Sequence, residues 1–310
     1  MAEKDITEKQ LEDYPDVFSD ILNVLLFGGE QIVHEDEIES VNIKSQLKLN
    51  GRIHEQERDV AKLWKKSFVR VAMIGFENQT RIDSSEVPRV ISYDGASYKA
   101  QLAEIEKCIR EHKTPPKLIP VVTLVLYFGK ADWKRMTLYE SIDIPDYLKK
   151  YVSDYRINVF QMKDLTKEQV DSFKSDFKIV ADYFYKIYHC GEYVPADDEI
   201  KHVDEVLKLM SALTNDCRFE DTINEIKSSG KEGVRMCEVL DKIVAQGEAR
   251  GEARGEARGI KVGEARGIEV GEEKLSKLLG LLKGADRMED FDKAISDKDY
   301  RKKLYAEFDM

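Results

Sequence analysis

The sequence lacks several features that would place it in a familiar class. No run of about 18 apolar residues occurs, so we expect no membrane-spanning helix. The first ten residues, MAEKDITEKQ, lack the apolar stretch of a signal peptide, so we do not expect secretion. No cysteines are paired as CxxC, which excludes a disulfide scaffold and a cysteine-rich zinc module. We therefore expect a cytoplasmic protein with free thiols at Cys108, Cys190, Cys217 and Cys237.

Common catalytic motifs are also absent. The sequence contains no GxxxxGKS or GxxxxGKT phosphate loop, no GxGxxG after a strand, no HExxH and no GxSxG. The five histidines are scattered without the spacing of zinc ligands. These absences exclude P-loop nucleotide hydrolysis, dinucleotide binding, zinc peptidase chemistry and the serine hydrolase elbow.

Charge is abundant but unevenly distributed. Charged residues make up 35% of the 310 residues, and the net charge is −11. The first 50 residues contain 12 acidic and 4 basic side chains, so most of the excess lies there. This balance argues against broad, non-specific binding of nucleic acid. The apolar share of 42% suffices for one sizeable core.

Hydrophobic patterns predict an α/β core over residues 15–195, after an N-terminal extension at 1–14. Helices are expected at 15–27, at 88–112 after Pro88, and from the Thr166 capping box to about residue 188. Strands are expected at 57–61, 69–79, 119–128 and 157–162, with a weaker signal at 31–34. The strand at 69–79 is apolar on both faces, so we expect it at the centre of the sheet.

The C-terminal third is predicted to be helical and contains a repeat. We expect a helical extension at 196–245, a repeat segment at 246–274 and one or two amphipathic helices at 275–310. The repeat reads GEAR, GEAR, GEAR, GIKV, GEAR, GIEV, GEEK. Its seven glycines would destabilise a lone helix by roughly 7 kcal/mol. Three interpretations stay open: a flexible linker, a self-associating helix that makes a homo-oligomer, or a repeat without selected structure.

Two predicted strands carry acidic residues that suit a metal ion. Asp59 lies in the strand at 57–61, and Glu77 and Gln79 share one face at the end of the next strand. If these strands pair, the two carboxylates come within reach of one ion. Two carboxylates and a carbonyl oxygen at Asn78 are the hard ligands that Mg²⁺ accepts. Such an ion would support hydrolysis of a phosphodiester.

The order of these segments resembles the PD-(D/E)XK phosphodiesterase core, and within it the Rpn (YhgA-like) family of recombination-promoting nucleases, also labelled transposases. The similarity covers residues 15–220 and is carried by PDVFSDILNVLLF, HEQERDVAKLW, MIGFENQT, RVISYDGASYKAQL, VVTLVLYFG and INVFQMKDL. It implies a restriction-endonuclease-like fold, a mixed sheet flanked by helices. It also implies Mg²⁺-dependent cleavage of DNA, linked to recombination or transposition.

The resemblance also assigns roles to individual residues. Asp59 and Glu77 would be metal ligands together with Asn78, and Gln79 would occupy the position of the usual lysine. Asp20 on the first helix would be an acidic helper, with Asp16 as its rival.

Further residues are candidates for contact with DNA phosphates. Arg89 and Tyr93 lie one helical turn apart, and basic side chains gather near the turn between the two acidic strands. These basic candidates are Lys65 and Lys66, with Lys62 and Arg70 beside them.

Two functions remain open from the sequence. The first is a Mg²⁺-dependent DNA endonuclease that uses Asp59, Glu77, Gln79 and Asp20. A glutamine cannot supply the positive charge of a lysine, so the second is a catalytically weak or inactive nuclease-like scaffold. That scaffold would bind DNA or protein and assemble through the repeat.

Overall fold

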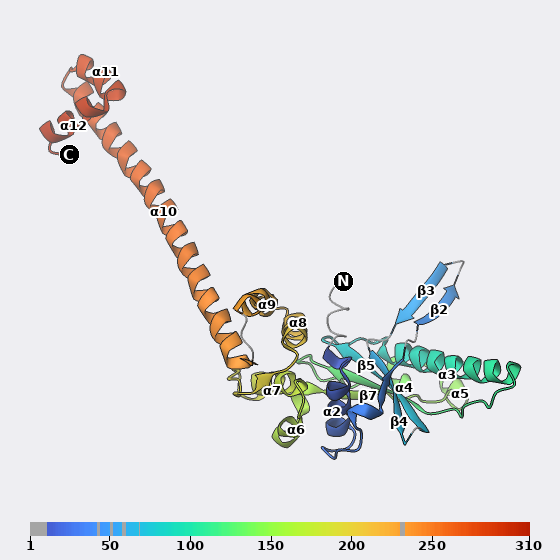
Figure 1. The fold of residues 1–310 in the computed structure, drawn as a ribbon. Helices are drawn as coiled ribbons and strands as arrows, with labels where there is room; N and C mark the ends of the chain where they lie inside the picture. Colours follow the sequence, from blue (N-terminus) through green and yellow to red (C-terminus); the bar gives the residue numbers. More distant parts are fainter. Residues whose placement is uncertain (1–10, 42–43, 50–51, 58–59, 68, 230–232) are drawn as a thin grey trace. The chain divides into compact units, whose positions relative to one another are not determined.

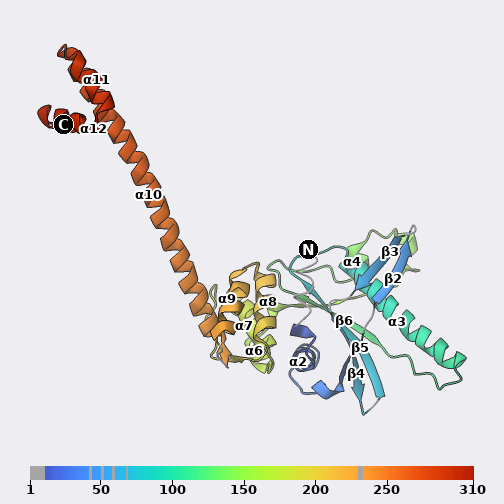
Figure 2. The same cartoon turned by 45° about the horizontal axis from the view of Figure 1, so that its top comes forward.

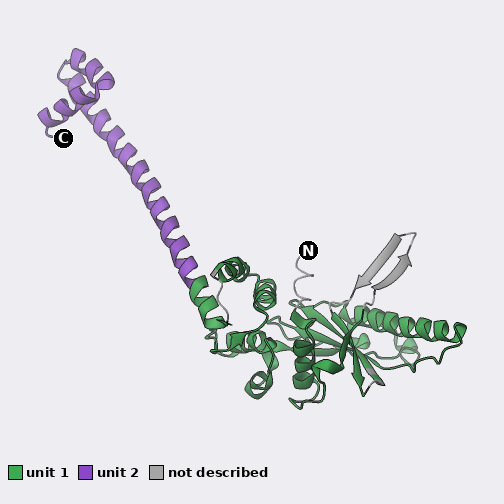
Figure 3. Ribbon diagram, viewed as in Figure 1, with its two compact units in different colours: residues 1–243 green, residues 244–310 purple. Residues whose placement is uncertain are grey.

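A computed structural model of the chain describes residues 11–41, 44–49, 52–57, 60–67, 69–229 and 233–310. The chain divides into two compact units, residues 1–243 and residues 244–310 (Figure 3). The first unit is an α/β domain built on a five-stranded mixed sheet (Figure 1). The fold class predicted from the sequence is therefore confirmed at the level of an α/β core followed by a helical C-terminal region.

The sheet has the order β1-β4-β5-β6-β7. Its first three strands, β1 (Ile38–Ser40), β4 (Val60–Lys66) and β5 (Val69–Gln79), pair antiparallel. The last two, β6 (Val121–Tyr127) and β7 (Asn158–Gln161), continue parallel to β5. β5 thus lies at the centre with neighbours on both sides, as its two apolar faces predict.

Helices cover both faces of the sheet, and α2 and α3 lie on opposite sides of it (Figure 2). The helix α2 (Pro15–Leu25) packs on the face that carries Phe76, and its Phe18 ring stacks on Phe76 with centroids 4.4 Å apart. The helix α7 (Phe177–His189) joins the same apolar cluster. The helix α3 (Glu86–Arg110) covers the other face, where Val87 and Val90 pack against β6.

Shorter elements complete the first unit. Around the sheet lie the short helix at residues 35–37, the hairpin β2 (Lys44–Leu49) and β3 (Arg52–Glu57), α4 (Leu138–Ser141), α5 (Asp146–Lys149), a short helix at residues 162–164 and α6 (Lys167–Ser172). After α7 come β8 (Glu199–Ile200), α8 (Val203–Thr214), α9 (Arg218–Ser229) and β9 (Val234–Arg235). The helices α8 and α9 extend the main apolar core, because Leu207, Met210 and Ile223 belong to the same cluster as α2 and α7.

The repeat lies within one helix, α10 (Met236–Gly284). Every residue at 248–274 is exposed, so nothing else within residues 244–310 packs on the repeat. The end of α10, α11 (Met288–Ser296) and α12 (Lys298–Glu307) bury Leu278, Leu282, Ala294 and Leu304 in a small core. The predicted terminal helices are confirmed, and the repeat is helical despite its glycines.

Of the strand expected at 57–61, Glu57 ends β3 and Val60 and Ala61 begin β4, which runs to Lys66; residues 58–59 lie outside the described residues. Two other sequence predictions on local structure are wrong. No strand forms at 31–34, because the backbone there turns to meet the side chain of Asn23. The helix expected from 166 to 188 is divided into α6 and α7 by residues 173–176. The Thr166 capping box at the start of α6 is confirmed.

Candidate active site

Glu77 is buried at the carboxyl end of the central strand. Its carboxylate side chain is 3% exposed. In the β5–β6 ladder Glu77 pairs with Val125, whose side chain packs against α3. Because side chains on paired positions share a face, Glu77 points to the side of the sheet that α3 covers. A carboxylate in this position lies at the edge where β5, β6 and β7 all end.

The two residues that follow Glu77 in the chain differ in orientation. Asn78 alternates to the opposite face, the side of Phe76 and α2, and is 8% exposed. Its side chain therefore does not share a face with Glu77. The predicted metal ligand at this position is the backbone carbonyl oxygen of Asn78. Gln79 returns to the face of Glu77, is partly exposed, and pairs with Tyr127.

The first turn of α3 contributes a charged group beside Glu77. The Arg89 guanidinium contacts the Glu86 carboxylate at 2.6 Å and that of Asp83 at 3.2 Å. Burial lowers the pKa of Arg89, but the carboxylates of Glu86, Asp83 and Glu77 outweigh burial and raise it. Arg89 lies in the first turn of α3 and Tyr93 one turn later, on the helix that covers the face of Glu77. Arg89 stays charged there.

Asp59 lies outside the described residues. The β4–β5 ladder is described from Val60, which pairs with Phe76, the residue before Glu77. The predicted antiparallel pairing of the two strands is therefore confirmed up to that position.

Asp20 lies on the other side of the sheet from Glu77, on α2, and has structural contacts. Its Oδ2 accepts hydrogen bonds from the backbone amides of Lys174 at 2.8 Å and Ser175 at 2.7 Å. It thereby fixes the turn between α6 and α7. Its other oxygen is buried without a hydrogen-bond partner among the described residues. This position does not fit an acidic helper for Glu77.

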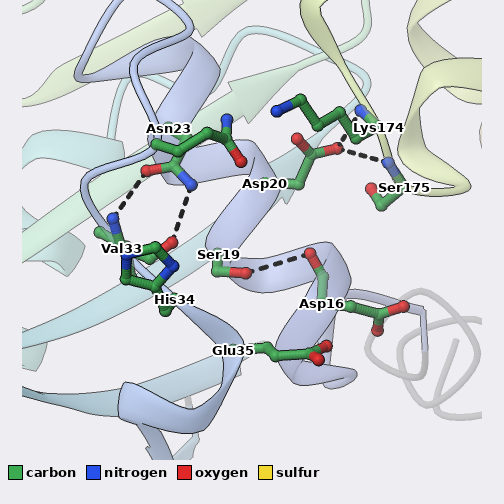
Figure 4. A pocket seen from close by; sticks show the side chains of 10 residues that line it. Asp16, Ser19, Asp20, Asn23, Val33, His34, Glu35, Lys174 and Ser175 are labelled. Atoms are coloured by element: carbon green, nitrogen blue, oxygen red, sulfur yellow. Dashed lines mark hydrogen bonds between the residues drawn. The ribbon is translucent and has the colours of Figure 1, made fainter.

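A hollow of about 240 Å³ surrounds Asp20 (Figure 4). The neighbouring Asn23 is buried, and its side chain binds the backbone of Ile32 and Val33. Asp16, the rival acid, contacts Lys201 at 2.6 Å. Both residues thus hold chain segments together.

The predicted basic cluster is separated from Glu77. Lys65 pairs with Arg70 at the opposite end of the β4–β5 ladder, about 23 Å along the strand from Glu77. Lys65 contacts Glu39 at 2.5 Å, Lys66 is exposed beside it, and Arg70 binds Glu104 at 2.7 Å. Lys65 and Lys66 therefore do not line the same site as Glu77.

Lys62, expected beside the candidate phosphate contacts Lys65 and Lys66, is buried. Its side chain is 1% exposed and donates to the Asp13 carbonyl and the Ser40 hydroxyl, both at 2.8 Å, and to the Asp13 carboxylate. One ammonium thus joins the segment before α2 to β1 and β4.

A buried polar group on α3 was missed by the sequence analysis. Asp94 is 4% exposed and accepts hydrogen bonds from Thr123 at 2.6 Å and from the Tyr155 hydroxyl. A hollow of about 310 Å³ lies beside it. A helical-face count would have found it, because Asp94 lies four positions after Val90 and seven after Val87, on the same buried stripe.

Among the described residues Glu77 is a buried strand carboxylate on the α3 face at the carboxyl edge, while Glu86 and Asp83 near it are paired with Arg89; no three His, Cys, Asp or Glu side chains of the described residues gather as a metal site. A buried carboxylate oxygen is a ligand type that suits Mg²⁺, which takes few protein ligands and keeps several waters. Glu77 fits that ion, and Asp59 is the residue that has to complete the set.

Comparisons with family models, with curated proteins and with solved structures found no match. None of the helices in the described part of the chain has the length and apolar content that crossing a bilayer requires.

Proposed function

We propose that the protein is a Mg²⁺-dependent DNA endonuclease of the PD-(D/E)XK superfamily, of the Rpn type, which acts in the cytoplasm in recombination or transposition. One observation carries the proposal: Glu77 is buried at the carboxyl end of the central strand, beside the charged first turn of α3. The order of a helix, antiparallel strands, a helix and a parallel strand agrees with a restriction-endonuclease-like fold.

Glu77 and Asp59 would hold the ion, with the Asn78 carbonyl as a third oxygen. Asp59 directly precedes Val60, so the proposal requires the β4–β5 ladder to extend by one pair, opposite Glu77. When bound, Mg²⁺ supplies positive charge for attack of water on a phosphodiester. Gln79, on the same face as Glu77, orients that water through its amide. Arg89 and Tyr93, one turn apart on α3, would contact a neighbouring phosphate.

The alternative is a nuclease-like scaffold that binds DNA or protein without cleavage. It is favoured by the ion pairs of Arg89, whose positive charge is already taken by Glu86 and Asp83. Position 79 carries a glutamine in place of a lysine, so it supplies no positive charge either. In both functions we propose that the exposed repeat of α10 mediates self-association.

Incubation of the purified protein with supercoiled plasmid and Mg²⁺ tests the proposal. We expect nicked or linear product with the wild type, and none with Glu77→Gln, with Asp59→Ala or with EDTA present. Glu39→Gln is the matched control, because Glu39 is an exposed carboxylate paired with Lys65 at the opposite end of the ladder. Cleavage by Glu77→Gln at the wild-type rate would refute the assignment. DNA binding without any cleavage would establish the scaffold.

A further inference from the structure

The helix α3 carries an apolar seam that the rest of residues 1–243 covers only in part; at its first residue, the Tyr98 hydroxyl accepts a hydrogen bond from the Val121 amide at 3.2 Å. Tyr98, Leu102 and Ile109 are 40%, 48% and 59% exposed, and Ile105 between them is partly exposed. These four residues, named here the α3 seam, are spaced by four, three and four positions. This spacing is the heptad pattern of helices that pair side by side.

The seam is exposed because α3 is longer than the strand on which it packs. Its 25 residues span about 37 Å, whereas the seven residues of β6 span about 23 Å. The C-terminal end of α3 extends past the sheet in Figures 1 and 2. The stripe that faces the protein, including Asp94, Ser97 and Gln101, lies one residue before the seam and is buried.

Charges beside the seam indicate what covers it. Lys99 and Glu106 flank the seam on its outer side, are exposed, and form no ion pair in the part of the chain that the structure describes. They are separated by one heptad and have opposite charge. When two identical helices pair antiparallel, equivalent flanking positions face each other, so Lys99 of each copy faces Glu106 of the other.

We propose that the α3 seam is the contact between two copies of this chain, with their α3 helices antiparallel. Ile109 of one copy then packs against Tyr98 of the other, and Leu102 packs against Ile105. The two copies form the pairs of Lys99 with Glu106 twice, related by the two-fold axis. In a parallel pair, Lys99 and Glu106 would instead face the other flank of the partner's seam, which carries Asp94 and Gln101. These two residues are already bound to Thr123 and Ile119, so a parallel pair lacks the charge complementarity.

The contact is short, so the association is weak. The seam extends over about 18 Å of helix, and such a contact buries less than the roughly 1,200 Å² of a stable interface. The dimer therefore forms reversibly with rising protein concentration. The contact is distinct from the repeat of α10 and does not depend on nuclease activity.

Sedimentation velocity of the full-length chain between about 1 and 200 µM tests the proposal, since weak interfaces dissociate in this range. We expect an average mass that rises with concentration. Leu102→Glu places a charge in the contact and should raise the dissociation constant at least about tenfold. Ala103→Glu is the matched control, because it adds the same charge to an exposed position of α3 outside the seam. Circular dichroism checks that each variant folds.

A charge exchange tests the orientation. Lys99→Glu or Glu106→Lys alone puts like charges together twice and should weaken the dimer roughly threefold to tenfold. The double variant Lys99→Glu with Glu106→Lys should restore it. A monomer at all concentrations, or an assembly that Leu102→Glu leaves unchanged, would overturn the proposal. Failure of the double variant to restore the mass would overturn the antiparallel arrangement.

Discussion

Replacement of Asp20 tests whether its carboxylate has a structural or a catalytic role. Asp20 is 5% exposed, and one of its oxygens accepts the amides of Lys174 and Ser175 at 2.8 and 2.7 Å. Hydrogen bonds to a charged group contribute about 1.5–3 kcal/mol each, so their loss sets an upper limit of about 3–6 kcal/mol. Water can enter the hollow beside Asp20 and bind the freed amides. We therefore expect Asp20→Ala to lower the free energy of unfolding by about 2–4 kcal/mol.

Asp20→Asn is the conservative partner of this experiment. An amide oxygen still accepts both backbone N–H groups but lacks the charge, so we expect a loss of about 1–2 kcal/mol. Urea unfolding followed by tryptophan fluorescence measures both values. Both tryptophans, Trp64 and Trp133, lie in residues 1–243, so the signal reports the unit that contains Asp20. Plasmid cleavage by Asp20→Asn should remain close to that of the wild type.

Two results would refute this interpretation of Asp20. A free energy of unfolding for Asp20→Ala within about 0.5 kcal/mol of the wild type would show that the two amide contacts contribute nothing measurable. Full stability of Asp20→Asn together with loss of cleavage would place Asp20 in the catalytic machinery instead.

Two further predictions concern the repeat and the contact between α2 and the residues that join β8 to α8. Removal of residues 244–310 should lower the sedimenting mass by more than the mass of the deleted segment, because the exposed repeat is lost; a mass per chain that changes only by the deletion would contradict self-association through α10. Burial raises the pKa of Asp16, but hydrogen bonds from Lys201 and His202 outweigh burial and hold that pKa below its usual range. Its contribution to stability is thus present above about pH 4 and lost as pH falls through the lowered pKa. Asp16→Asn should therefore be less stable by about 0.5–1 kcal/mol at pH 7, and this deficit should shrink as the pH falls through the lowered pKa. A deficit in the urea midpoint that does not shrink with falling pH would be inconsistent with this.

The sequence predicted the strands whose signal is local. The alternation in β5 and the continuous apolar run of β6 identified both strands and the central place of β5, because buried strands need apolar residues on both faces. The helix α3 was predicted to start at Pro88 and starts at Glu86, since proline is tolerated in a first helical turn.

The failures depend on contacts between distant parts of the chain. The break between α6 and α7 is stabilised by Asp20, which is more than 150 positions earlier in the chain. Nothing in the sequence of residues 173–176 indicates that Asp20 accepts their backbone hydrogen bonds. Lys62 was expected beside the candidate phosphate contacts. A lysine is rarely buried without a partner, and the burial of Lys62 depends on oxygens from Asp13 and Ser40, which are distant in the sequence. The face of Glu77, in contrast, followed from strand alternation alone.

The β4–β5 ladder is irregular at one place, between Trp64 and Lys65, where Ala72 and Arg70 are the successive partners. One extra residue on β5 is accommodated there as a bulge. Beyond it, Val60 to Trp64 keep an unbroken register with Phe76 to Ala72. A deletion on the turn side of the irregularity can be absorbed locally. A deletion between Ala72 and Glu77 would shift the register by one residue, so the Glu77 side chain would point to the α2 face of the sheet. Length variation in this hairpin is therefore tolerable near its tip and intolerable near its base.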